Sequence, residues 1–266
     1  MCTLTVIQQD SELIITMNRD ESRDRHEAGL EQTQITSTTG LPSTIIFPKD
    51  SHAGGTWLGI NNNGVAMCLL NRYQDQKKTD GSIISRGHII PTALAHGNIE
   101  SIIEHLIPLN FIHYNPFDLF VFSQQQSIQV SWNGSNSSMT SIDLNQPLMH
   151  TSSSVRFPAV AKYRNVLFSG IVKKEAAIDH HKILQFHLQQ DSKDPSSSVL
   201  MSREETHTKS IVQIQIANQS TQLSYSRENE IKKLLTQKII NKENSTIMTL
   251  THLNNVSTNI SAIHQH

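Results

Sequence analysis

The sequence is poor in cysteine, lacks a long apolar run and carries no excess of charge of either sign. Among its 266 residues are only two cysteines, Cys2 and Cys68, which argues against a disulfide framework. No run of about 18 apolar residues occurs, so we expect no membrane-spanning helix. With 22 basic and 23 acidic residues the net charge is −1, which gives no bulk attraction to nucleic acid or to anionic membranes.

Several signatures of metal and cofactor sites are also absent from the sequence. The 14 histidines form no His-Glu-x-x-His motif, and neither a paired Cys-x-x-Cys nor the glycine pattern of a phosphate or dinucleotide loop occurs. We therefore expect neither a metal nor a cofactor. The first residues lack the basic-then-apolar pattern of a signal peptide, so we expect a cytoplasmic location.

The composition is that of a globular protein with few aromatic residues. Hydrophobic residues make up 36% and aromatic residues 5% of the chain, and a chain of this length buries roughly 70–75% of its unfolded surface. We expect one domain over residues 1–241. Residues 242–266 are rich in Asn, Thr, Ser and His, so a loose tail is expected there.

A cysteine stands directly behind the initiator methionine. Methionine is removed before a small residue, so Cys2 is expected to begin the mature chain with a free amino group. Such a residue combines a nucleophilic thiol with a base, because an α-amino group has a pKa of about 7.7–8.0 and can accept the thiol proton. The alternative is that Cys2 is only a small apolar residue at the start of an edge strand.

The first 18 residues read as a β-hairpin that brings charged residues to the side of Cys2. Two β-rich runs, 2–8 and 12–18, flank Gln9-Asp10-Ser11. With the turn at 9–10 or at 10–11, Cys2 lies opposite Met17 or Arg19. Either register places the run 18–21, Asn-Arg-Asp-Glu, beside the cysteine.

A second hairpin is predicted around Asn63-Gly64, a pair that favours a type I′ turn. It joins the runs 56–60 and 65–71. In this register Asn71 pairs with Thr56, beside Gly54-Gly55. These glycines would allow a substrate to approach the backbone closely.

The remaining elements alternate between groups of helices and groups of strands. This order, with hairpins rather than βαβ units, favours antiparallel sheets covered by helices. The patterns predict helices over 86–106 (with breaks at Pro91 and Gly97), 155–170, 175–189 and 227–240, and strands over 117–123, 127–132, 208–216 and 220–225.

Together these motifs resemble the Asn-Arg-Asp-Glu family, also called the transport and Golgi organisation protein 2 family. The matching residues fall in order within roughly the first 90: Met1-Cys2, Asn18-Arg19-Asp20-Glu21, Gly54-Gly55-Thr56-Trp57-Leu58-Gly59, and Gly64-Val65-Ala66 leading to Asn71-Arg72. Ser85-Arg86-Gly87 and Asn115-Pro116-Phe117-Asp118-Leu119 match more weakly. The resemblance implies an N-terminal-nucleophile hydrolase-like α+β fold, an αββα sandwich with two antiparallel sheets between helix layers.

The resemblance also implies roles for four residues. Cys2 is the expected nucleophile, and Arg19 would favour its thiolate. Asp20 would orient the α-ammonium group, and the Asn71 amide would donate to the oxyanion. The alternative for the run 18–21 is a solvated charged turn, and the alternative for Asn71 is a strand-ending residue.

The sequence departs from the pattern of the related hydrolases at two places. Their second oxyanion asparagine corresponds to Ser152, whose hydroxyl has a shorter reach. A late Arg-Thr pair falls on His207-Thr208, so a permanent charge becomes a titratable one. We predict that the residues contacting the substrate are Asn18, Gly55, Arg86, Ser152 and His207. Arg86 would meet a substrate carboxylate, or else be a surface arginine.

The leading hypothesis is a hydrolase that cleaves a non-peptide C–N (amide) bond in a small metabolite or acyl conjugate. It needs no cofactor, and its expected partner is a small-molecule substrate rather than nucleic acid. A weaker alternative is a degenerate scaffold for protein partners. The alternative, which the resemblance also implies, is a non-catalytic protein of haem, lipid or acyl-CoA homeostasis or of Golgi organisation, with the same pocket as its binding site. Nothing in the sequence indicates the oligomeric state.

Overall fold

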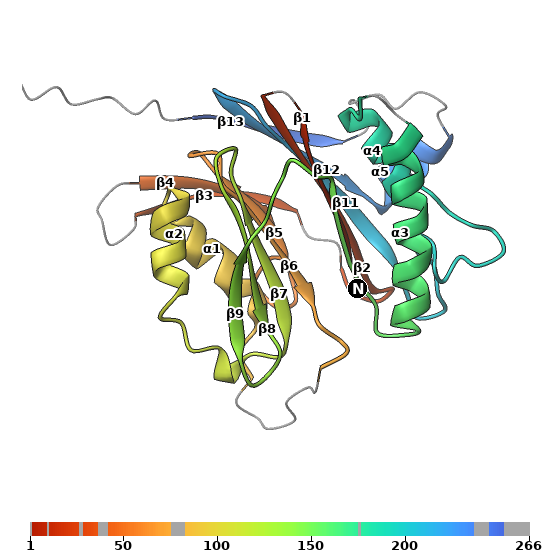
Figure 1. Cartoon of the computed structure of the whole chain (residues 1–266), viewed down its shortest axis with the longest axis horizontal. Helices are drawn as coiled ribbons and strands as arrows, with labels where there is room; N and C mark the ends of the chain where they lie inside the picture. Colours follow the sequence, from red (N-terminus) through yellow and green to blue (C-terminus); the bar gives the residue numbers. More distant parts are fainter. Residues whose placement is uncertain are drawn as a thin grey trace, which may run out of the picture.

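Two antiparallel β-sheets face each other, and helices cover the outer side of each sheet (Figure 1). The structure is a computed structural model that describes residues 2–9, 11–26, 29–36, 42–75, 83–174, 177–236 and 245–252. Its architecture is the α+β, αββα sandwich that the sequence predicts. Every strand pairing within the two sheets is antiparallel.

The first sheet has the strand order β10-β1-β2-β11-β12-β13. It contains the two N-terminal strands in its middle, so Cys2 begins an internal strand rather than an edge strand. The bounds are β1 Cys2–Gln9, β2 Glu12–Ser22, β10 Leu148–Ser152, β11 Thr206–Ile216, β12 Ser220–Arg227 and β13 Thr246–Thr251.

The second sheet runs in sequence order from β3 to β9. Each strand pairs with its neighbour along the chain, so the sheet is a meander. The bounds are β3 Leu30–Thr36, β4 Pro42–Pro48, β5 Leu58–Asn61, β6 Ala66–Asn71, β7 Phe117–Phe122, β8 Ser127–Trp132 and β9 Ser137–Ser141.

Helices α1 and α2 lie outside the second sheet, and α3, α4 and α5 lie outside the first (Figure 1). None of the helices within the described ranges is both long and apolar enough to cross a membrane. The bounds are α1 Ile89–Leu94, α2 Ile99–Leu106, α3 Phe157–Lys174, α4 His180–His187 and α5 Glu228–Thr236, with short 3-10 turns at Arg86–His88 and Phe111–His113.

The alternation of side chains along β1 and β2 decides which residues face the other sheet. On β1, Cys2 and Leu4 belong to the apolar core between the sheets, whereas Thr3 lies on the side of the helices. On β2, Met17 lies in the inter-sheet core, so Arg19 shares its face. The intervening residues 18 and 20 therefore face α3 and α4.

The structure confirms one of the two predicted registers of the first hairpin. Cys2 pairs with Arg19 and Gln9 pairs with Glu12. The turn residue Asp10 lies outside the described residues. On its other side Cys2 pairs with Ser152 of β10.

The second hairpin differs from the prediction by one residue. Leu58 pairs with Cys68, so the register expected from a two-residue turn is wrong. The Asn61 side chain causes the difference, because its Oδ1 accepts hydrogen bonds from the backbone N–H groups of Asn63 and Val65, both at 3.1 Å. The loop is therefore longer, and Gly64 has a positive φ of 71° while Asn63 does not.

The predicted helix over 86–106 is interrupted at Gly97, as expected, but not at Pro91. Gly97 has a φ of 85°, and Asn98 caps the next helix by accepting a hydrogen bond from the Ser101 N–H. Pro91 is the third residue of α1, where its missing N–H costs no helical hydrogen bond.

The expected loose tail is wrong for part of its length. Residues 246–251 form β13, which pairs with β12 at the edge of the first sheet. Met248 and Leu250 lie two positions apart on one face of the strand, where Leu250 packs into the inter-sheet core and Met248 packs against it. Residues 242–244 and 253–266 of that tail, like 237–240 of the last predicted helix, lie outside the described residues.

A buried histidine joins α4 to the first sheet. The Nδ1–H of His187 donates to Asn18 Oδ1 at 2.7 Å, and Thr5 Oγ1 lies 2.8 Å from Nε2. The Asn18 amide nitrogen donates to the carbonyls of His187 and Val199 at 3.0 and 2.9 Å, which leaves Oδ1 as an acceptor. Burial, with a smaller contribution from the charge of Arg164, lowers the pKa of His187 to about 3.

This pKa makes the stability of the fold depend on pH. Between pH 6.5 and about 3 the unfolded chain binds a proton at His187 that the folded chain does not, so stability falls as the pH falls through this window. We expect His187→Gln to destabilise the protein at pH 7, and the gap to wild type to narrow by roughly 2 kcal/mol at pH 4.5. Urea unfolding of both proteins at pH 7 and pH 4.5 measures the difference in their free energies of unfolding. A difference that does not change between the two pH values would contradict the prediction.

Candidate functional site

A cavity of about 210 Å³ opens beside Cys2 at one end of the two sheets. It takes side chains from β1 and β2 of the first sheet and from β6 and the loops that flank β5 and α1 in the second. The structure brings together six of the nine predicted site residues here: Cys2, Arg19, Asp20, Gly55, Asn71 and Arg86.

The other three predicted residues do not line this cavity. Asn18 is fully buried and its side chain is bonded to α4 and to Val199, because its position on β2 faces the helices. Ser152 contacts the nitrogen of Cys2. His207 lies on β11 with its Nε2 3.2 Å from a carboxylate oxygen of Glu228. The expectation that these three line the substrate pocket is not met.

Cys2 is held from both sides and is only 9% exposed. Its backbone N–H donates to Ser152 Oγ at 3.1 Å; this nitrogen is an amide here and would be the α-amino nitrogen after removal of Met1. Burial raises the pKa of the Cys2 thiol, while the charge of Arg19 and a backbone hydrogen bond from Asp20 oppose this increase. The thiol is therefore protonated at neutral pH and needs a base to react.

Arg19 lies on the same face of the sheet as Cys2. Its Nη2 donates to Asp50 Oδ2 at 2.9 Å and lies 3.4 Å from Glu21 Oε2. Its guanidinium carbon is 4.3 Å from the centre of the Trp57 ring, a cation–π contact. The ion pair and the ring hold the guanidinium in one place beside the thiol.

Asp50 forms ion pairs with both Arg19 and Arg25 on this side of the cavity. It accepts hydrogen bonds from Arg25, at 2.6 Å, and from the backbone N–H groups of His52 and Ala53. Burial alone would raise the pKa of Asp50, but the hydrogen bond from Ala53 and the two arginines together lower it. Within the described part of the chain, no three His, Cys, Asp or Glu side chains gather as a metal site.

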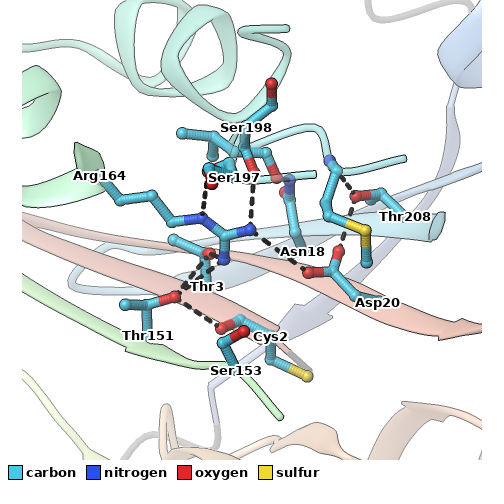
Figure 2. Close-up of polar contacts among 12 residues, drawn as sticks. Cys2, Thr3, Asn18, Asp20, Thr151, Ser153, Arg164, Ser197, Ser198 and Thr208 are labelled. Carbon is cyan, nitrogen blue, oxygen red and sulfur yellow. Dashed lines mark hydrogen bonds and ion pairs between the residues drawn. The ribbon is translucent and has the colours of Figure 1, made fainter. Parts of the chain in front are cut away.

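The carboxylate of Asp20 points to the opposite side of the sheet from Arg19. Thr208 Oγ1 donates to Asp20 Oδ1 at 2.6 Å, and Arg164 Nη2 lies 3.8 Å from Oδ2 (Figure 2). Burial raises the pKa of Asp20, and the charge of Arg164 opposes this increase most strongly.

Asn71 and Arg86 approach the cavity from the second sheet. The Asn71 amide nitrogen donates to Tyr73 Oη at 2.9 Å. Arg86 donates from Nη1 to the Pro116 carbonyl at 2.8 Å, and burial lowers the pKa of its guanidinium. Neither side chain has an acidic partner among its described contacts.

Gly55 shapes the wall of the cavity by packing against backbone. A Cβ atom at this position would lie 2.5 Å from the carbonyl carbon of Gly87. The Thr56 N–H donates to the Gly87 carbonyl at 3.0 Å, which ties the two loops together. Gly55 therefore allows a close approach of the Gly87 backbone.

The comparisons with known proteins agree with this fold. The family model described as Transport and Golgi organisation 2 matches residues 1–258. The chain belongs to this family. No curated protein matches the sequence.

Three solved structures show the same fold at low sequence identity. A cysteine-to-alanine mutant of conjugated bile acid hydrolase from Clostridium perfringens is 10% identical over 95% of this chain and 97% of its own, with a TM-score of 0.50. An arginine-to-leucine variant of that enzyme is 10% identical over 98% and 100%, with a TM-score of 0.51. The N-acylethanolamine-hydrolyzing acid amidase ortholog from Caenorhabditis elegans is 12% identical over 80% and 92%, with a TM-score of 0.53. The chain thus belongs to a family with an N-terminal-nucleophile hydrolase-like fold.

Sequence reasoning missed four residues of this site. Asp50 and Arg164 lie in segments without a recognisable motif, and only the folded chain brings them to Arg19 and Asp20. Trp57 was named only as part of the family motif, and it is buried and lines the cavity. Thr208 stood next to the predicted His207, and it is the side chain of Thr208 that contacts Asp20.

The contact between Gly55 and Gly87 leads to a stability prediction. We expect Gly55→Ala to destabilise the protein by about 1–3 kcal/mol, because the new methyl group would overlap the Gly87 backbone. Gly170→Ala on α3 is the matched control: nothing lies within 4 Å of its Cβ position, and alanine favours a helix, so no loss is expected. Urea unfolding of both variants tests this, and equal stability of the two would refute it.

Proposed function

We propose that the protein is an N-terminal-cysteine hydrolase of a non-peptide amide bond in a small acyl conjugate. The observation that carries the proposal is the placement of Cys2, whose side chain lines the cavity beside Arg19 while its nitrogen is bonded to Ser152. The names of the structural relatives, a bile acid hydrolase and an acid amidase, support this class of reaction.

The reaction begins once removal of Met1 gives Cys2 a free amino group. This amine accepts the thiol proton, and the Cys2 sulfur attacks the substrate carbonyl carbon. The amide C–N bond breaks as the ammonium returns the proton to the leaving nitrogen, and a thioester remains. Water then attacks the thioester, with the amine again as base, which releases the acid and restores the thiol.

The Asn71 amide is the proposed donor to the oxyanion. A side-chain amide nitrogen carries two N–H groups, and one of them is bonded to Tyr73 Oη, which leaves the other for the substrate. Ser152 takes a different part from the one expected. It accepts a hydrogen bond from the Cys2 nitrogen, so it orients the base rather than the substrate.

The lining of the cavity supports an amphiphilic substrate. Ile83 and Ile84 lie at its edge with 42% and 44% of their surface exposed, a suitable contact for an acyl chain. Arg86 brings a positive charge to the same cavity and binds only a backbone carbonyl in the described contacts. We propose that it meets a carboxylate or another anionic group of the substrate.

The second candidate function is binding without cleavage. It is favoured by the raised pKa of the Cys2 thiol and by the position of Ser152, which leaves the Asn71 side chain as the one proposed amide donor to an oxyanion. The family's name associates it with transport and Golgi organisation. In this case the cavity would hold a haem, a lipid or an acyl-CoA.

The first functional prediction concerns Cys2. We expect intact mass spectrometry to show that Met1 is absent and that an amide-mimicking electrophile adds to Cys2. Cys2→Ala should abolish both the labelling and amide hydrolysis with little change in unfolding, because the cysteine side chain is small. The control for the labelling is Cys68→Ala, which removes the other buried thiol and should still react with the electrophile at Cys2.

The outcomes separate the two functions. Turnover that survives Cys2→Ala would disprove the mechanism. A chain that retains Met1, shows no turnover and shifts the Soret band of added haem would instead support the binding protein.

The second functional prediction concerns Asn71. We expect Asn71→Ala to lower kcat by about 10²–10³-fold with little change in KM, because the hydrogen bond is made to charge that develops in the transition state. Tyr73→Phe should reduce kcat less, since it removes only the partner that orients the amide. Steady-state kinetics would exclude the assignment if Asn71→Ala raised KM alone.

A further inference from the structure

Arg164 is a buried arginine behind Cys2, on the opposite side of the first sheet from the cavity. It comes from α3, and its side chain is only 1% exposed. Its Nη1 donates to Thr3 Oγ1 at 2.6 Å and to Thr151 Oγ1 at 2.9 Å, which connects it to β1 and β10. Its Nε and Nη2 donate to the carbonyls of Ser197 and Ser198 at 3.2 and 2.6 Å (Figure 2).

One branch of this network reaches the reacting residue, and a second branch reaches Asp20. Thr151 Oγ1 donates to the carbonyl oxygen of Cys2 at 3.1 Å, so one branch fixes the backbone of Cys2. The other branch ends at Asp20, whose Oδ2 lies 3.8 Å from Arg164 Nη2 and whose Oδ1 accepts from Thr208. Figure 2 shows the guanidinium between these branches.

We propose that Arg164 is a positioning residue for Cys2, which anchors the Cys2 backbone through Thr151 and holds Asp20 as a charged carboxylate beside the start of β1. Its guanidinium is suited to this task because it is planar and presents donors in several fixed directions. A lysine in its place would keep the charge but would lose the fixed fork. This inference rests on the proposed function, because it takes Cys2 as the reacting residue.

The charges around Asp20 show why this arginine matters. Burial favours the neutral form of Asp20, and Arg164 provides the largest opposing charge. Arg203, from the loop before β11, adds a weaker one, and the charge of Asp20 in turn acts on the Cys2 thiol, which lies on the other face of the sheet. His187 of α4 lies near Arg164 and is neutral at physiological pH. Without Arg164, Asp20 would lose its charge at a higher pH and cease to orient the amino group of Cys2.

The test follows the rate of Cys2 alkylation by iodoacetamide against pH in the full chain, read at the Cys2 peptide by mass spectrometry. We expect Arg164→Met to move the inflection caused by Asp20 to higher pH by about 1–3 units. Arg164→Lys should leave that inflection in place, because it keeps the charge. In Asp20→Asn the inflection should be absent, and adding Arg164→Met should not restore it.

The controls separate positioning from a general loss of structure. Lys173→Met removes an exposed charge from the same helix and should leave the profile unchanged. Should Arg164→Met fail to fold, Arg164→Gln carries the same expectation, because its amide can still donate to a carbonyl. The proposal would be overturned if the pH profile of Cys2 alkylation in Arg164→Met or Arg164→Gln kept its inflection at the wild-type pH. It would also be overturned if Arg164→Lys moved the inflection as far as Arg164→Met does. The readout needs no substrate, so a failure to find hydrolysis does not affect it.

Discussion

The antiparallel pairing of β1 with β2 and β10 is the constraint on which the rest of the site depends. It places Cys2 opposite Arg19 on one side and Ser152 on the other. Because side chains alternate along a strand, the same pairing sends Asp20 to the opposite face of the sheet. A slip of one residue would exchange the two faces and separate the thiol from its arginine.

The site is built from two charge clusters, one on each face of this sheet. On the cavity side, Arg19 is held by Asp50 and stacks over Trp57. On the helix side, Arg164 lies near Asp20 and is surrounded by hydroxyl and carbonyl acceptors. Charges at this depth are stable only when paired or hydrogen-bonded, so each cluster is also a strong determinant of the local geometry.

Much of the fold followed from local patterns, and the errors have identifiable physical causes. The helices that cover the first sheet, the N-terminal hairpin and strands β7 and β8 all show a clear periodicity of apolar residues. The hairpin at Gly64 was misplaced by one residue because a single side chain, Asn61, competes for its backbone donors. β3 and β13 were missed because these edge strands carry polar residues on both faces, so their sequences lack the strict alternation that marks a strand.

The sequence by itself indicated antiparallel sheets covered by helices and limited the residue opposite Cys2 to Met17 or Arg19, because these depend on periodicity and on pairing between neighbours along the chain. The candidate nucleophile followed from the position of Cys2 behind Met1, and the αββα class from the family resemblance. Only the tertiary structure decided which of residues 18–21 face the cavity and which partners they meet. Asp50 contacts Arg19, which lies 31 positions away in the sequence. Arg164 and Thr208 contact Asp20 across 144 and 188 positions. No local pattern records such contacts, since they arise from the packing of sheets and helices that form separately along the chain.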